Sequence, residues 1–133
     1  MKTSEIIFNE KYCIYGIIIN EQVNPIYLKI SDELESAYEL LQDDYKERIA
    51  DFVNSSGKWF PIACEKIISE VDNADGLRLI SIHVLFEQSQ SDSLFGLMFS
   101  LDFDREHGRG MMLNGETFEI LKYGDADVAF EGM

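Results

Sequence analysis

The chain has 133 residues, of which 25 are acidic and 11 are basic, so its formal net charge is −14. Apolar residues make up 46% of the sequence, which is too much for a disordered acidic tail. We therefore expect a single globular domain over residues 1–133, with a strongly negative surface. Such a surface repels nucleic acids and anionic membranes and attracts basic proteins.

The N-terminal residues lack the basic start, continuous apolar stretch and cleavage site of a signal peptide. No stretch of the sequence is apolar for long enough to span a membrane. Cys13 and Cys64 lie far apart and form no Cys-x-x-Cys pair, which favours two buried thiols in a reducing compartment. Together these features predict a cytoplasmic protein.

The N-terminal part of the sequence predicts a β-hairpin. Residues 11–20 are rich in β-branched and aromatic types, and residues 25–30 form a second such run. The polar break at 20–24 suits the connection between two paired strands.

A helix is predicted from about Leu34 to Val53, because apolar residues recur there at intervals of three and four. Asp32 and Glu35 have the spacing of a capping box at its start. The stretch Asn54–Gly57 is expected to end the helix with a glycine cap.

A second helix is predicted over residues 59–71. Pro61 suits its first turn, where the missing N–H of proline costs nothing. Trp59 is interpreted as a core residue at the start of this helix, and an exposed interface aromatic is the alternative.

After residue 76 the apolar pattern changes to a period of two, which predicts β-strands. Asn114-Gly115 favours a two-residue type I′ hairpin turn. The expected strands cover 79–86, 94–103, 110–113 and 116–122, with 128–130 as a candidate edge strand. An N-terminal β-hairpin, two helices and an antiparallel β-meander predict an α+β fold with the helices packed on one face of the sheet.

The negative charge is concentrated in the first helical region. Residues 31–54 hold eight acidic and two basic side chains, whereas residues 1–30 hold three of each. Acidic residues on the outward side of the predicted helix are candidates for binding a basic partner: Glu39, Asp43, Asp44, Glu47 and Asp51. The alternative is a face that is polar for solubility, because like charges three or four residues apart cost only about 0.2–0.5 kcal/mol per pair.

A polar cluster near residue 104 raises the question of a metal site. Asp102, Asp104 and Glu106 alternate as the oxygen ligands of a calcium loop do. The spacing does not fit, because His107 stands at the sixth position, which requires glycine, and Leu113 stands at the twelfth, which requires Glu. We expect no metal and no cofactor, and interpret the cluster as a turn that follows a strand.

No set of residues has the spacing of a known catalytic site. His83 and His107 are the only two histidines, so a two-histidine acid–base pair would need both of them. Cys13 is predicted in a strand and Cys64 in an apolar helix, neither beside an obvious base. The sequence also has no glycine-rich phosphate loop and no nucleophile elbow. We therefore expect no enzymatic activity and no catalytic residue.

Two segments of the C-terminal third resemble the end of a family of small, uncharacterised bacterial domains. The segments are Asp104-Arg-Glu106-His107-Gly108-Arg-Gly110 and Gly124-Asp-Ala-Asp127-Val-Ala-Phe130. The family has an acid-x-Glu-His-Gly-x-Gly turn and a closing Gly-x-x-Asp segment. The resemblance implies a cytosolic α+β domain in which six residues order the turn: Asp104, Glu106, His107, Gly108, Gly110 and Asp127.

The overall profile is similar to that of immunity proteins of bacterial toxin systems, including contact-dependent growth inhibition. Those proteins are small, often acidic, and each neutralises one toxin domain, frequently a basic nuclease. A nuclease needs a positive cleft for phosphates, and an acidic surface can dock there in place of the nucleic-acid backbone. The similarity implies a toxin-binding protein. A binding or regulatory module unrelated to toxins is the alternative.

Overall fold

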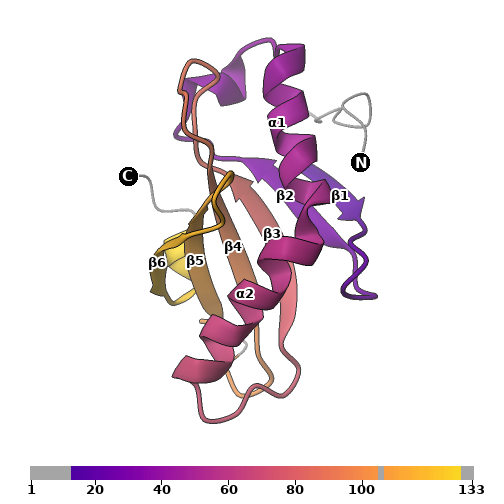
Figure 1. The fold of residues 1–133 in the computed structure, drawn as a ribbon, viewed down its shortest axis with the longest axis vertical. Helices are drawn as coiled ribbons and strands as arrows, with labels where there is room; N and C mark the ends of the chain where they lie inside the picture. The colour runs from indigo at the N-terminus through magenta and orange to yellow at the C-terminus, as the bar shows by residue number, and fades with distance from the viewer. Residues whose placement is uncertain (1–12, 105–106, 130–133) are drawn as a thin grey trace.

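The computed structural model describes residues 13–104 and 107–129, which form one mixed β-sheet with two α-helices (Figure 1). The coarse prediction of an α+β fold is confirmed. The elements in chain order are β1 (Cys13–Ile17), β2 (Ile26–Ile30), the 3-10 helix η2 (Glu35–Tyr38), α1 (Asp43–Asn54), α2 (Ser56–Glu70), β3 (Arg78–Val84), β4 (Leu94–Ser100), β5 (Arg109–Asn114), β6 (Ile120–Gly124) and the 3-10 helix η3 (Ala126–Ala129).

All six of these strands belong to one sheet, in the order β1-β2-β3-β4-β5-β6. β1 pairs antiparallel with β2, and the four strands from β3 to β6 pair antiparallel in chain order. β2 and β3 are parallel, with Leu28 opposite Ile82. The sheet is therefore mixed, which the predicted hairpin and meander did not include. The helices connect β2 to β3, and such a crossover is the usual connection between parallel neighbours.

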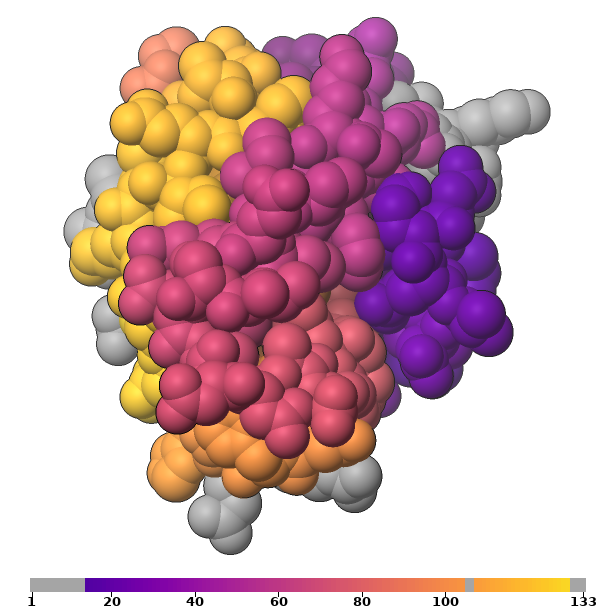
Figure 2. Space-filling model, turned by 60° about the horizontal axis from the view of Figure 1, so that its bottom comes forward, coloured from indigo at the N-terminus to yellow at the C-terminus, as the bar shows by residue number. Residues whose placement is uncertain are grey.

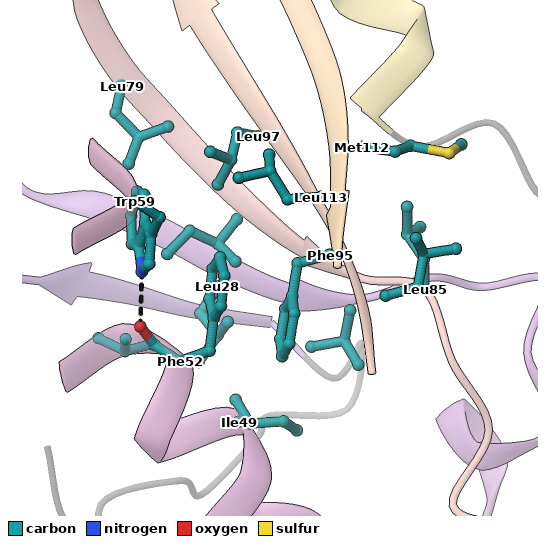
Figure 3. Close-up of a cluster of buried hydrophobic side chains, with 14 of the residues drawn as sticks. Leu28, Ile49, Phe52, Trp59, Leu79, Leu85, Phe95, Leu97, Met112 and Leu113 are labelled. Carbon is teal, nitrogen blue, oxygen red and sulfur yellow. Dashed lines mark hydrogen bonds between the residues drawn. The ribbon is translucent and has the colours of Figure 1, made fainter. Parts of the chain in front are cut away.

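Both helices lie on one face of the sheet (Figure 1). In Figure 2 they run across the molecule between the N-terminal hairpin, in indigo, and the β6–η3 region, in yellow. Between helices and sheet, the Phe52 ring stacks on both Trp59 and Phe95, with centroid distances of 4.8 and 3.9 Å. The Trp59 side chain is fully buried and donates a hydrogen bond to the Phe52 carbonyl (Figure 3). Trp59 is thus a core residue, as predicted, and not an exposed aromatic.

The opposite face of the sheet is covered over β4 and β5 by η3. The predicted edge strand at 128–130 is wrong as far as it is described, because Ala126–Ala129 is a 3-10 helix; Phe130 lies outside the described residues. Gly96 of β4 and Gly110 of β5 allow this close packing. A Cβ at Gly96 would lie 1.6 Å from the Ala129 carbonyl oxygen, so no larger residue fits beneath η3.

The first predicted helix begins later than its apolar pattern indicates. Residues 35–38 form η2, and α1 begins only at Asp43. The expected capping box is not formed, because the Glu35 backbone N–H donates to the Glu87 carboxylate at 2.9 Å instead. Tyr38, predicted to face the core, is 72% exposed. Hydrogen bonds from a distant loop have replaced the local helical ones.

The junction between the helices also differs from the prediction. α1 ends at Asn54, Ser55 separates the helices, and Gly57 lies inside α2 without a positive φ angle, so it is no glycine cap. α2 begins at Ser56, and Pro61 is its sixth residue rather than part of its first turn. The missing N–H of proline therefore removes one backbone hydrogen bond from the helix.

The β5–β6 hairpin is present, but the predicted two-residue turn is wrong. The connection runs from Gly115 to Glu119, and Phe118 has the positive φ, at 63°. The Asn114 side chain accepts hydrogen bonds from the backbone N–H groups of Glu116 and Thr117, which stabilises the longer loop.

β4 is shorter than predicted. It ends at Ser100, and Phe103, expected on the core face of the strand, lies beyond it with 53% of its surface exposed. The chain turns away here, because the Asp102 backbone N–H donates to the Asp75 carbonyl, outside the ladder between strands.

Candidate functional site

The outward side of α1 carries four of the five predicted partner-binding residues. Tyr45, Ile49 and Phe52 of α1 are buried against the sheet. The remaining side of a 3.6-residue helix falls on the four acidic residues, all of which are exposed: Asp43, Asp44, Glu47 and Asp51. α1 therefore presents a continuous acidic stripe to solvent.

The acids of this stripe have no partner of opposite charge in the described part of the chain. None of the ion pairs among residues 13–104 and 107–129 includes one of them. Asp43 and Asp44 lie in the first turn, where negative charge interacts favourably with the helix dipole. Glu47 and Asp51 lie beyond that turn. Their charges bring the helix no such stabilisation.

Glu39, the fifth predicted residue, does not lie on the helix. It follows η2, in the segment that leads to α1, where it is exposed. Residues 35–42 are held by the loop between β3 and β4. The Glu87 carboxylate accepts hydrogen bonds from the backbone N–H groups of Glu35 and Ser36 and from the Ser36 hydroxyl. The Gln88 side chain bonds to the backbone of Leu40 and Gln42.

Glu87 is a structural acid that the sequence analysis did not single out. Burial alone would raise the pKa of its carboxyl. The hydrogen bonds from Ser36 and Glu35 lower this pKa by more than burial raises it, so the pKa lies below the ordinary value. Glu87 therefore stays ionised and holds η2 in place. No local spacing identifies it, because its partners lie more than 50 residues earlier.

Two large apolar residues are exposed in the segment held by Glu87. Tyr38 is 72% exposed and Leu40 is 93% exposed, on either side of Glu39. The Tyr38 hydroxyl donates to the Asp32 carbonyl, which anchors the ring at its far end. Exposed, ordered aromatic and aliphatic side chains beside acidic ones are typical of protein interfaces. The candidate site, called here the acidic surface, comprises Tyr38, Glu39, Leu40, Asp43, Asp44, Glu47 and Asp51.

The turn singled out in the C-terminal third is held together by Asp104. Its carboxylate accepts hydrogen bonds from the side chains of Arg109 and His107, and these keep the pKa of Asp104 below its ordinary value. Gly108 has a φ of 59°, a conformation that favours glycine. The Gly110 position faces the η3 backbone.

Asp127, another residue of the predicted turn, lies on η3. Asp127 is exposed, and its backbone N–H donates a hydrogen bond to the Asp125 carboxylate. Glu106 lies outside the described residues. The structure thus gives Asp104, and not Asp127, the central position.

The two histidines lie near opposite ends of β4, although neither belongs to that strand. His83 is paired with Gly96, near the start of that strand, and His107 follows its end. They therefore do not form the two-histidine acid–base pair considered above. His83 forms a hydrogen bond through Nε2 with the Ser81 hydroxyl, at 2.9 Å. Ser81 is only 4% exposed, whereas His83 is partly exposed and lines a surface pocket with Lys29 and Glu33. Ser81 and His83 are two residues apart in a strand and therefore share one face of the sheet, which their spacing in the sequence already indicates.

In the described part of the chain, no three His, Cys, Asp or Glu side chains are grouped closely enough to hold a metal ion. Cys64 is partly buried, and burial raises the pKa of its thiol to about 11. The side chain of Cys13 lies outside the described residues.

Comparison with known proteins identifies no relative. The chain has no significant match to any protein-family model, curated protein or solved structure. No helix among the described residues combines the length and apolar character needed to cross a membrane.

Proposed function

We propose that this protein is an immunity-type inhibitor that binds a cognate bacterial toxin domain and has no catalytic activity of its own. The toxin would be a basic, nuclease-type domain whose phosphate-binding cleft receives the acidic surface. The observation that carries the proposal is the unpaired acidic stripe of α1 beside the exposed Tyr38 and Leu40. The protein would act in the cytoplasm, and its partner would be a protein rather than a nucleic acid or a membrane.

Charge and apolar contact would have different roles in binding. The α1 acids would steer a positive partner and raise the association rate, which then falls as salt screens the charges. Tyr38 and Leu40 would supply apolar contact, which slows dissociation. Because Glu87 and Gln88 hold the segment before binding, little conformational entropy is lost on docking.

The proposal is tested by co-expressing the protein with basic nuclease-type toxin domains, including any encoded beside its own gene. We expect one domain to be neutralised and to form a complex whose association rate falls steeply with salt. Charge reversal at Asp43, Asp44 and Glu47 should slow association several-fold. Reversal of Glu65, which is exposed on α2, is the matched control and should have a smaller effect.

Two results would contradict the proposal. A protein that binds none of these domains is not their inhibitor. A complex with weak salt dependence, unaffected by the three reversals, would instead indicate the alternative binding module, with contacts away from α1.

A further inference from the structure

A groove of about 430 Å³ lies beside the β3–β4 loop. Its walls come from residues 31–34, from residues 85–94 and from the β5–β6 hairpin. Its apolar lining consists of Phe86, which is fully buried, and four leucines, of which Leu121 is the most exposed: Leu34, Leu85, Leu94 and Leu121. Figure 3 shows Leu85 on the opposite side of the strands from Phe52 and Trp59. Leu85 therefore lies on the other face of the sheet from these two residues, whereas Phe86, which also lines the groove, packs against Tyr45 and Phe95 in the core.

The charged side chains that line this groove are all acidic: Glu33, Glu87 and Asp92. The Glu87 carboxylate is occupied by three hydrogen bonds from Glu35 and Ser36. Glu33 and Asp92 are exposed, and neither takes part in an ion pair among the described residues. Their charges favour a cation beside an apolar group.

The basic residues near these walls already have partners. The Arg48 guanidinium, on the α1 side of the loop, donates to the Ser91 carbonyl and the Ser93 hydroxyl and lies 4.5 Å from the Phe86 ring centroid. Lys29 is paired with Asp32 at 3.3 Å. Neither side chain neutralises Glu33 or Asp92 in the structure.

Backbone hydrogen bonds hold the groove open in one shape. The Leu85 N–H donates to the Leu94 carbonyl at 2.9 Å, and the Gly115 N–H donates to the Ser93 carbonyl at 2.8 Å. The second bond joins the β5–β6 hairpin to the loop. It requires glycine, because a Cβ at position 115 would lie 2.6 Å from the Phe95 ring. A preformed groove binds without the cost of ordering its walls.

We propose that this groove binds an aliphatic side chain carried by a basic polypeptide segment, with Glu33 and Asp92 contacting the flanking lysines or arginines. The leucine floor receives the apolar side chain, and the acidic rim selects its charged neighbours. The inference rests on the proposed function only for the identity of the protein that carries the segment. The volume lies within the range of about 300–1,000 Å³ usual for ligand pockets.

The test uses three blocked pentapeptides and the full-length, ¹⁵N-labelled protein. Their sequences are Lys-Lys-Leu-Lys-Lys, Lys-Lys-Gly-Lys-Lys and Glu-Glu-Leu-Glu-Glu. We expect the first to shift the amide signals of Leu85, Leu94 and Gly115 in a saturable way. It should bind roughly tenfold more tightly than the glycine peptide, as expected for partial burial of one leucine. The acidic peptide should not bind.

Matched variants locate the binding. Leu121 is 45% exposed, so Leu121→Ser should remove the advantage of the leucine peptide without unfolding the protein. Val23→Ser, at a 92% exposed apolar position elsewhere, is its control. Asp92→Asn should weaken both lysine peptides several-fold, whereas Glu65→Asn on α2 should have little effect.

The outcomes separate this inference from the proposed function. Equal affinity for the leucine and glycine peptides, shifts confined to other residues, or equal effects of Leu121→Ser and Val23→Ser would overturn the groove assignment even if a toxin domain is neutralised. Leucine-dependent binding that Leu121→Ser abolishes would support it even if no toxin domain binds.

Discussion

The two helices differ on their outward sides although they cover the same face of the sheet. α1 has four acidic and two basic residues, whereas α2 has two of each. α2 exposes Ile62 and Ile68 where α1 exposes its acidic stripe. A helix in this position therefore does not need an acidic exterior in order to fold. The difference directs attention to partner binding as the reason for the stripe.

We expect the largest effect on the free energy of unfolding from a substitution on the inner side of the helices, which packs against the sheet. Phe52→Ala removes a ring stacked between Trp59 and Phe95, and should lower the free energy of unfolding by about 3–5 kcal/mol. Ile68→Ala, on the outward side of α2, should change it by no more than about 0.5 kcal/mol. Urea unfolding monitored by circular dichroism measures both. Similar losses for the two variants would break the distinction between inner and outer sides.

A pH titration extends the comparison to the sheet face opposite the helices, where His83 lies. Burial, and secondarily the charge of Lys29, lowers the pKa of His83 to about 4, from an ordinary value of 6.5. Between these values the unfolded chain binds a proton that the folded chain does not. The free energy of unfolding should therefore fall as the pH drops below 6.5, by up to about 1.4 kcal/mol per pH unit, and this contribution should level off below pH 4.

The His83→Gln variant isolates this contribution from that of the carboxylates. It should show a shallower loss of unfolding free energy between pH 6.5 and pH 4.5, measured by urea unfolding at each pH. If the two pH profiles are parallel, His83 is not the group that responds.

The smallest expected effect compares the outward charges of the two helices directly. Glu47 lies four residues from both Asp43 and Asp51, so Glu47→Gln should raise the free energy of unfolding by about 0.2–0.5 kcal/mol per repulsion removed. In α2, Lys66 pairs with Glu70 at 2.8 Å, so Lys66→Gln should lower it by a similar amount. Thermal unfolding measures both, and both differences should shrink in about 1 M NaCl. Effects of the same sign would mean that the acidic stripe is not under repulsion.

Much of the fold follows from local patterns. The three- and four-residue spacing of Tyr45, Ile49 and Phe52 and the alternation in β4 correctly predict these two elements and the apolar side that each buries, and the period of two also predicts β3. The start of α1 could not be predicted in this way. Leu34 and Tyr38 continue the helical spacing, yet the amides of residues 35 and 36 bond to Glu87.

The residues of the candidate site also fall into those that the sequence predicts and those that it does not. Its acidic residues can be read from the sequence, because charge and helical spacing are local properties. The exposure of Tyr38 and Leu40 cannot, since their apolar character is equally typical of a core. The groove also requires the folded chain, because its walls come from three separate segments.

By itself, the amino-acid sequence determined the charge of this protein, the order of its two α-helices and six strands, and the apolar sides that α1 and β4 bury. The tertiary structure decided the parallel pairing of β2 with β3, the folding of 126–129 into η3 across β4 and β5, and the shortening of α1. The physical reason is the range of the interactions. Side-chain periodicity acts over one or two turns, whereas each of these features depends on partners brought together only when the sheet forms.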